Sequence, residues 1–380
     1  MRQNTNTPVY FDNAATSFPK PESVYRAVQQ AMRQTGGNPG RGGHPLAHRA
    51  GEAVYHARET AAGMFAAEPE HVVFTLNCTH ALNLAVHGLL HQGDHVIISN
   101  HEHNSVARQA AALADSGIIR LSVANVFPED DRTVAEFRRL LRPDTRAVIC
   151  MLVSNVTGQI LPYRQIAAVC RANKTAFLAD GAQCCGVLPV TLQDGMQILC
   201  TAGHKGMYGP AGTGLLISDG TLALEPLMQG GTGSLSASLE QPDFLPDALE
   251  PGTVNVPGIA GLDTGMQYVK QKGTERIFMQ ETALCDRLIA GLRKMPDAVI
   301  YRQPGARYAP VVSFTLGREK PDETAARLAA QGFCVRAGLH CAPLAHRALG
   351  TPSGTVRFSP SCFNTEAETD AFLRALRVQP

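Results

Sequence analysis

Two glycine-framed segments carry residues that could bond covalently to a substrate. Lys205 lies in Thr-Ala-Gly-His-Lys-Gly-Met-Tyr-Gly-Pro, residues 201–210, and Cys341 lies in Val-Arg-Ala-Gly-Leu-His-Cys-Ala-Pro, residues 335–343. A lysine amine condenses with carbonyl compounds, and a cysteine thiolate is a strong nucleophile. The two segments therefore predict an imine-forming Lys205 and a nucleophilic Cys341.

A carboxylate follows an apolar segment upstream of the lysine. Residues 175–180, Thr-Ala-Phe-Leu-Ala-Asp, predict a buried strand that ends at Asp180, and open α/β sheets bind ligands at the carboxyl ends of their strands. Pyridoxal phosphate needs a lysine for its aldehyde and an acid for its pyridinium nitrogen. Lys205 and Asp180 could supply both, although each alone is more often a surface charge or a turn residue.

These segments resemble a known family. Asp-Gly-Ala-Gln at 180–183 followed by Gly-His-Lys at 203–205 resembles the class V aminotransferase superfamily of fold-type I enzymes, and within it the cysteine desulfurase and selenocysteine lyase branch. The similarity extends from Tyr-Phe-Asp-Asn-Ala-Ala-Thr at 10–16 to Gly-Thr-Val-Arg-Phe-Ser at 354–359. It implies an α/β fold with a large, mostly parallel sheet domain wrapped by helices, expected at residues 16–260. A smaller α+β domain would comprise residues 1–15 and 261–380.

The resemblance also implies the contacts of a pyridoxal 5'-phosphate cofactor. His103 would stack on its ring and shuttle protons, which suits a planar group that titrates near neutrality. Thr79 begins an expected helix, and helix N-termini bind anions such as phosphate. Ala202 departs from the family, which often has Ser or Thr there, so a phosphate hydrogen bond is missing or rerouted. The full set of expected cofactor residues is Lys205, Asp180, Gln183, His103, Cys78, Thr79, His204, Asn155 and, from the second subunit of a homodimer, Thr253.

An arginine is the expected partner of an amino-acid carboxylate, because a guanidinium pairs with it in a bidentate way. Arg357, between apolar neighbours, is the first candidate, and a pair with an internal acid is its alternative role. Arg336 is the second candidate. Asn155 and Asn13 complete the expected substrate site.

The segment around Cys341 resembles the short catalytic-cysteine loop of one desulfurase group. We expect His340 and nearby cations to favour its thiolate, and L-cysteine to become L-alanine with a persulfide on Cys341. Lys205, Cys341 and His103 would be the catalytic residues. The alternatives are a selenocysteine lyase acting on L-selenocysteine, another class V aminotransferase or β-eliminating lyase, and a non-catalytic scaffold. Cys362 and the Cys184-Cys185 pair are interpreted as buried thiols, with sulfur acceptance as their alternative role.

Composition limits the partners of this chain. The chain has 380 residues, 44% of them hydrophobic, and a chain of this length usually forms more than one hydrophobic core. Its net charge of +1 predicts neither nucleic-acid nor membrane binding. The ten cysteines are scattered without a repeated Cys-x-x-Cys, and the N-terminus has no apolar signal core. We therefore expect a cytoplasmic protein with reduced cysteines and no metal, and a sulfur-acceptor protein as a possible partner.

The arrangement of apolar segments predicts the elements that position these residues. Short apolar runs at 95–99, 147–153 and 214–217 are typical of buried parallel strands. They alternate with helical patterns at 22–34, 49–66, 79–90, 105–116, 134–141 and 164–173, as in a wound α/β lobe. Farther on we expect a helical stretch at 258–295, strands at 311–316 and 356–359, and a helix at 322–331. The glycine-rich loop at 36–43 would lie at the mouth of the active site.

Overall fold

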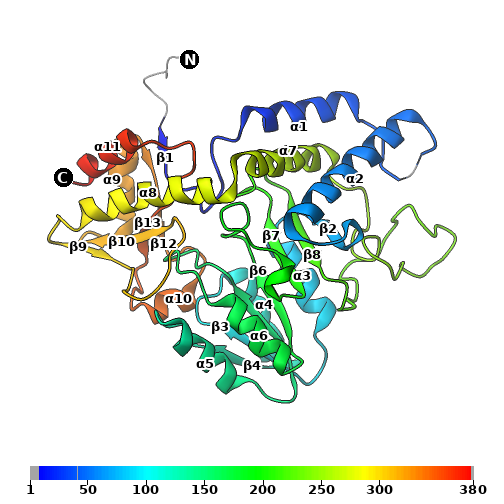
Figure 1. Cartoon of the computed structure of the whole chain (residues 1–380), viewed down its shortest axis with the longest axis horizontal. Coiled ribbons are helices and arrows are strands. Elements are labelled where there is room, and N and C mark those ends of the chain that lie inside the picture. Colours follow the sequence, from blue (N-terminus) through cyan, green and yellow to red (C-terminus); the bar gives the residue numbers. More distant parts are fainter. Residues whose placement is uncertain (1–7, 41, 378–380) are drawn as a thin grey trace.

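The computed structural model describes residues 8–40 and 42–377 of the chain. Residues 1–7 therefore lie outside the described residues. They include most of the N-terminal segment in which no signal core was found, and they begin the expected N-terminal arm. One residue of the glycine-rich loop, Arg41, also lies outside the described residues. Figure 1 shows a large body of helices around a central sheet and a smaller unit that contains the C-terminal third of the chain.

The central sheet has seven strands in the order β2-β8-β7-β6-β5-β3-β4. Strands β3 to β7 form parallel pairs, whereas β8 runs antiparallel to both of its neighbours. The expectation of a mostly parallel sheet is confirmed, but the parallel direction predicted for 214–217 is wrong. The strands are β2 (Val72–Thr75), β3 (Asp94–Ser99), β4 (Ile119–Ala124), β5 (Thr145–Met151), β6 (Ala176–Asp180), β7 (Ile198–Ala202) and β8 (Gly214–Ser218).

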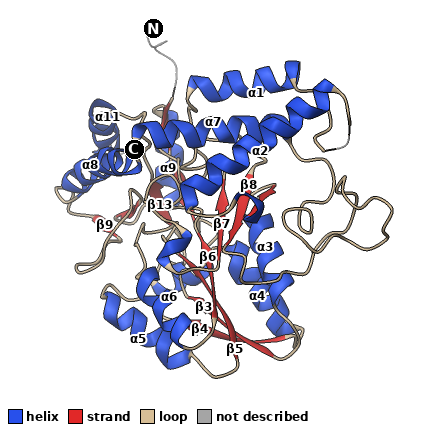
Figure 2. Ribbon diagram, turned by 45° about the vertical axis from the view of Figure 1, so that its right-hand side comes forward, coloured by secondary structure: helices blue, strands red, loops and turns tan. Residues whose placement is uncertain are grey.

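Helices cover both faces of this sheet, and each face has its own apolar core. Side chains of α3 and α4 fill one core, and side chains of α2, α5, α6 and α7 fill the other. Figure 2 shows α3 and α4 on one side of the strands and α5 and α6 on the other. The helices are α1 (Glu22–Gln34), α2 (Pro45–Phe65), α3 (Cys78–Leu89), α4 (Asn104–Asp115), α5 (Asp130–Leu140), α6 (Tyr163–Ala172) and α7 (Val256–Lys272), with short 3₁₀ turns at Pro69–His71 and Leu192–Asp194.

The smaller unit is built on an antiparallel sheet with the order β12-β13-β10-β9. Its apolar core combines aliphatic side chains with phenylalanines, among them Phe11, Phe314, Phe358 and Phe372. Strand β1 (Val9–Tyr10) pairs in parallel with β11 and so ties the N-terminal segment to this unit. The remaining elements are α8 (Thr274–Leu292), β9 (Ala298–Ile300), β10 (Val312–Leu316), α9 (Pro321–Ala330), β11 (Phe333–Cys334), β12 (Arg336–Gly338), α10 (Pro343–Ala348), β13 (Thr355–Phe358) and α11 (Glu366–Arg377).

Two details differ from the sequence-based expectation for this region. The single helical stretch expected at 258–295 is wrong, because Gly273 has a φ of 83° and separates α7 from α8. The predicted domain boundary at residue 260 falls inside α7, so this helix crosses it. Among the described residues, no helix combines the length and the apolarity needed to cross a membrane.

Candidate active site

A cavity of about 290 Å³ lies where the carboxyl ends of β5, β6 and β7 meet the first turns of α3 and α4. Most of the residues singled out from the sequence line it, although they come from distant parts of the chain. Its lining includes Cys78, Thr79, His103, Asn155, Asp180, Gln183, His204, Lys205, Arg336 and Arg357. The fold therefore brings ten of the expected site residues to one place.

Lys205 and Asp180 both face this cavity. Burial lowers the pKa of the Lys205 amine, and the Asp180 carboxylate opposes that shift. Oδ1 of Asp180 accepts a hydrogen bond from the amide of Ala182 at 2.9 Å and lies 3.5 Å from the sulfur of Cys78. Burial raises the pKa of the Cys78 thiol, so the thiol is protonated and donates to the carboxylate. Both of these contacts involve Oδ1, so within the described part of the chain the second oxygen of Asp180 can accept a hydrogen bond from a ligand.

His103 is the N-cap of α4, and its ring is fixed by this role. Its Nδ1 accepts a hydrogen bond from the amide of Ser105 at 3.1 Å. Burial lowers the pKa of His103, so the ring is neutral at pH 7 and carries its proton on Nε2. The preceding residue, Glu102, is fully buried and accepts a hydrogen bond from the amide of Met151 at 3.0 Å. Burial raises the pKa of Glu102 to about 8, so this carboxyl group is also neutral at pH 7.

The start of α3 forms an anion-binding corner of the cavity. The side chain of Asn77 caps the amide of His80 at 2.9 Å, and the first amides of a helix have no intrahelical acceptor, so those of Cys78 and Thr79 can bind an anion. The ring of His204 faces the same cavity, and burial lowers its pKa to about 4. The hydroxyl of Thr201 lies 3.4 Å from the carbonyl oxygen of Gly181, so it does not replace the hydroxyl that Ala202 lacks.

Arg357 lies in the cavity and also has the internal pair that was its alternative role. It lines the cavity, and with 1% of its surface exposed it also pairs with an internal acid, since Nη2 donates to Oδ1 of Asp12 at 2.8 Å. Its Nη1 donates to the carbonyl oxygen of Asn155 at 3.0 Å. Sequence reasoning missed Asp12, although it belongs to the segment at 10–16 that carried the family resemblance.

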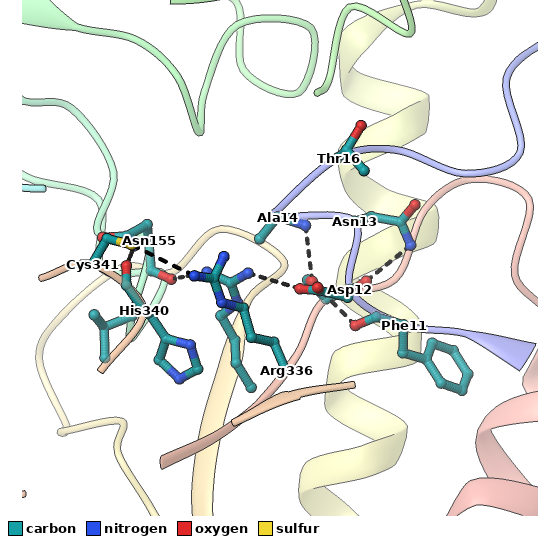
Figure 3. A network of polar contacts seen from close by, with 12 residues as sticks. Phe11, Asp12, Asn13, Ala14, Thr16, Asn155, Arg336, His340 and Cys341 are labelled. Carbon is teal, nitrogen blue, oxygen red and sulfur yellow. Dashed lines mark hydrogen bonds and ion pairs between the residues drawn. The ribbon is translucent and has the colours of Figure 1, made fainter. Parts of the chain in front are cut away.

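Cys341 follows His340, which lines the cavity, and Figure 3 shows it close to Asn155. Both His340 and Cys341 have left-handed φ values, 48° and 56°. The amide of Asn155 donates to the carbonyl oxygen of His340 at 2.7 Å, and the backbone N–H of Asn104 donates to that of Cys341 at 2.7 Å. These two contacts hold the loop against the large body.

Arg336, and not His340, is the cation next to the sulfur of Cys341. Nη2 of Arg336 lies 3.5 Å from Sγ, and a guanidinium stabilises negative charge on sulfur. The expectation that His340 supplies positive charge is wrong. Its Nε2 donates to the carbonyl oxygen of Thr355 at 3.1 Å, and burial lowers its pKa to about 2, so the ring is neutral.

Three expected site residues have other contacts. Gln183 lines the cavity and donates to the carbonyl oxygen of Ala14 at 3.0 Å. Both ends of the Asn13 amide are occupied, because it donates to the carbonyl of Ser359 and accepts from the amide of Phe18, each at 3.0 Å. Thr253 is exposed and lies 3.3 Å from the amide nitrogen of Asn38. The cofactor and substrate roles expected of these residues stay predictions.

The donors and acceptors of the cavity fit pyridoxal 5'-phosphate. Four buried polar atoms of its lining have no hydrogen-bond partner among the described residues: Oδ1 of Asn155, Nδ1 of His204, Nδ1 of His340 and Nε of Arg357. A polar ligand would satisfy them. The anion-binding corner at α3 matches a phosphate, the free oxygen of Asp180 matches a pyridinium nitrogen, and the amine of Lys205 matches an aldehyde.

Comparison with known proteins finds similarity over nearly the whole length of the chain. The family model described as aminotransferase class-V matches residues 9–372. A probable cysteine desulfurase of Methanothermobacter thermautotrophicus is 32% identical and is matched over 95% of this chain and 92% of its own length. The apo structure of the cysteine desulfurase of Thermococcus onnurineus NA1 superposes with a TM-score of 0.92 at 30% identity, covering 97% of this chain and 94% of that one.

A longer relative is also similar. A probable cysteine desulfurase of Mycolicibacterium paratuberculosis is 34% identical over 97% of this chain. This chain spans 55% of the length of that relative. Similarity to it therefore concerns about half of the longer protein.

Proposed function

Because this chain belongs to the class-V aminotransferase family, we propose that it is a cysteine desulfurase that uses pyridoxal 5'-phosphate and converts L-cysteine to L-alanine. The observation that carries this proposal is the guanidinium of Arg336 at 3.5 Å from the sulfur of Cys341, beside the cavity of Lys205. An aminotransferase has no use for a cation-stabilised thiol at this position. A desulfurase needs a thiolate that can reach the sulfur of its substrate.

The residues that would hold the cofactor are those of the cavity. Lys205 would bond to its aldehyde, Asp180 would pair with its ring nitrogen, and His103 would stack on its ring. The amides of Cys78 and Thr79, with the ring of His204, would hold the phosphate. When bound, the cofactor supplies an electron sink for the pair released at the substrate Cα. We also propose that a homodimer forms and that Thr253 of the second copy reaches the phosphate.

Arg357 would bind the carboxylate of the substrate. It is held by Asp12 and by the carbonyl oxygen of Asn155, and its buried Nε has no partner among the described residues. Such a fixed guanidinium loses little conformational freedom when it binds a carboxylate. With the substrate held there, the amine of Lys205, once released from the cofactor, would take the proton from Cα, and burial lowers the pKa of that amine.

Cys341 would then take the sulfur. Its thiolate attacks the sulfur of the substrate, an S–S bond forms, and the bond between Cβ and sulfur breaks. The electron pair of that bond stays with the three-carbon fragment, which gains a proton at Cβ, regains one at Cα from the amine of Lys205 and leaves as L-alanine. Cys341 keeps the sulfur as a persulfide, which a thiol, a reductant or a sulfur-acceptor protein removes. We propose that this occurs in the cytoplasm.

The test is the release of L-alanine from L-cysteine by the cofactor-loaded protein in the presence of a thiol reductant. The wild type should form alanine and sulfide in equal amounts, and Cys341→Ala should form almost none. Equal alanine release by both proteins would exclude the role of Cys341. L-Selenocysteine is measured in parallel as the second candidate substrate. If the protein is a selenocysteine lyase, Cys341→Ala should still release selenium from it.

A further inference from the structure

The segment between β1 and α1 is packed against the backbone of Lys205. The carbonyl oxygen of His204, which belongs to the peptide bond that precedes Lys205, accepts from Nζ of Lys20 at 2.8 Å and from the amide of Ser17 at 3.0 Å. The hydroxyl of Thr16 lies 3.1 Å from the same oxygen. This carbonyl therefore has more donors around it than the two that a carbonyl normally accepts.

Ser17 connects Lys20 to the carbonyl on the other side of Lys205. Nζ of Lys20 donates to the hydroxyl oxygen of Ser17 at 2.7 Å. That hydroxyl lies 3.0 Å from the carbonyl oxygen of Lys205 and 3.2 Å from that of His204, and it donates its one proton to the nearer oxygen, that of Lys205. Lys20 thus acts on both peptide groups that flank the Cα of Lys205, directly on one side and through Ser17 on the other.

Lys20 is an unusual residue in this position. Its side chain is half-buried, and among the described residues it takes part in no ion pair with an acid. Burying a lysine without an acid costs free energy, and burial lowers its pKa to about 8. It is still charged at pH 7, so its bonds to the hydroxyl and the carbonyl are those of an ammonium, which are stronger than neutral hydrogen bonds.

We propose that Lys20 is a positioning residue for Lys205: its ammonium group fixes the two peptide groups around Lys205 and so sets the direction in which the Lys205 side chain enters the cavity. This inference rests on the proposed function, in which Lys205 bonds to the cofactor. Lys20 itself is not part of the cavity lining, so it acts through the backbone and not by contact with a ligand.

A fixed backbone matters here because the Lys205 side chain is long and flexible. A positioned reacting group avoids the entropy cost of finding its geometry at each turnover. Without the ammonium, the carbonyl of His204 loses its charged donor and the hydroxyl of Ser17 loses its own donor. Only neutral donors, the amide of Ser17 and the hydroxyl of Thr16, then hold the peptide group that leads into Lys205. A cofactor bound to Lys205 would be held less firmly in one orientation.

The experiment compares the holoproteins of the wild type, Lys20→Met, Lys20→Arg and Lys294→Met. Lys294 is exposed and remote from the cavity, so it controls for loss of a lysine charge. Borohydride reduction and mass spectrometry of the wild type first establish that the cofactor is bonded to Lys205. Two quantities are then measured: the visible circular dichroism per bound cofactor, which depends on a single fixed orientation, and the rate of cofactor release.

Lys20→Met should lose visible ellipticity per bound cofactor and release the cofactor faster by about tenfold or more. Lys20→Arg, which keeps a charged donor, should recover part of both, and Lys294→Met should equal the wild type. Wild-type ellipticity and release in Lys20→Met would overturn the proposal. If Lys20→Met does not fold, Ser17→Ala removes the bridging hydroxyl in its place, and wild-type values there overturn it as well. Failure of the wild type to bond the cofactor at Lys205 would instead refute the proposed function, and with it the role of Lys20.

Discussion

Arg336 of β12 and Arg357 of β13 are direct cross-strand partners, yet their guanidinium groups have different partners. Arg336 reaches the sulfur of Cys341 at 3.5 Å, whereas Arg357 pairs with Asp12 at 2.8 Å. Like charges on paired positions repel each other, and Asp12 offsets one of the two. One guanidinium is therefore held by an acid of the fold, and the other lies beside the thiol.

Removing the charge of Arg336 should make Cys341 less reactive. In Arg336→Ala the sulfur has no guanidinium beside it, so its alkylation by iodoacetamide at pH 7 should slow by roughly fivefold to tenfold. The rate is measured by mass spectrometry of the peptide that contains Cys341. Arg318→Ala, which removes an exposed arginine, is the control and should react as the wild type does. Equal rates in Arg336→Ala and the wild type would contradict the assignment of this cation.

Replacing Asp12 by asparagine should destabilise the protein and weaken substrate binding. Arg357 is 1% exposed, so it would keep a buried charge without its acid. Breaking a buried ion pair costs about 3 to 5 kcal/mol, and because the side chain of Asp12 is 19% exposed we expect the lower end of that range. Urea unfolding measures the loss. The KM for L-cysteine should also rise, since Arg357 is no longer fixed, and an unchanged KM would argue against its role in carboxylate binding.

The position of Asp180 and Lys205 in the cavity could be predicted because both residues follow strong local signals. The apolar run that ends at Asp180 forms β6 as expected, and the glycine-framed segment brings Lys205 into the same cavity. The direction of β8 could not be predicted in this way. Its residues are buried on both faces whether it runs parallel or antiparallel, so its apolar run is the same in either case.

Contacts between distant segments were the part that the sequence did not reveal. Asp12 and Arg357 are 345 positions apart, and nothing near either residue marks the other as its partner. The neutral state of His340 likewise depends on its burial and on the carbonyl of Thr355, which a local pattern does not contain. Lys20 lies in a proline-rich turn, and its role could not be predicted from the sequence. Its partner is the backbone carbonyl of His204, and every residue has such a carbonyl.

The protein should lose stability as the pH rises through neutrality, and Glu281 should account for part of that loss. Burial raises the pKa of Glu281 from its ordinary value of 4.5 to about 8. Between these two pH values the folded protein keeps a proton that the unfolded chain has lost. The contribution of Glu281 to stability is therefore fully present below pH 4.5 and decreases until about pH 8. The slope is about 1.4 kcal/mol per pH unit.

Glu281→Gln should remove this contribution. The amide has the same shape and does not titrate, so the variant should gain stability relative to the wild type as the pH rises from 5 to 8, by about 1.4 kcal/mol per unit at most. Urea unfolding at several pH values measures the difference. Glu275→Gln, which changes an exposed glutamate of the same helix, should follow the wild type. A constant difference between Glu281→Gln and the wild type across this range would show that Glu281 is ionised in the folded protein.

The ten cysteines should fall into two groups when the native protein is alkylated. All ten lie within the described residues, and eight of them are buried, whereas Cys334 and Cys341 are partly exposed. Short treatment with iodoacetamide should label these two alone, and treatment in denaturant should label all ten, as counted by mass spectrometry. Labelling of a buried cysteine at the rate of Cys341 would contradict this arrangement.

Cys362 should remain dispensable for alanine formation. Its sulfur lies 3.2 Å from the hydroxyl of Tyr208 in an apolar group of side chains, and it has no cation beside it in the described part of the chain. Cys362→Ala should therefore release alanine at the wild-type rate while losing about 1 kcal/mol of stability with the lost contact. Because Cys341→Ala should abolish the reaction, the two variants together distinguish the nucleophilic thiol of Cys341 from the buried thiol of Cys362. A loss of alanine release in folded Cys362→Ala would instead make Cys362 part of the sulfur route.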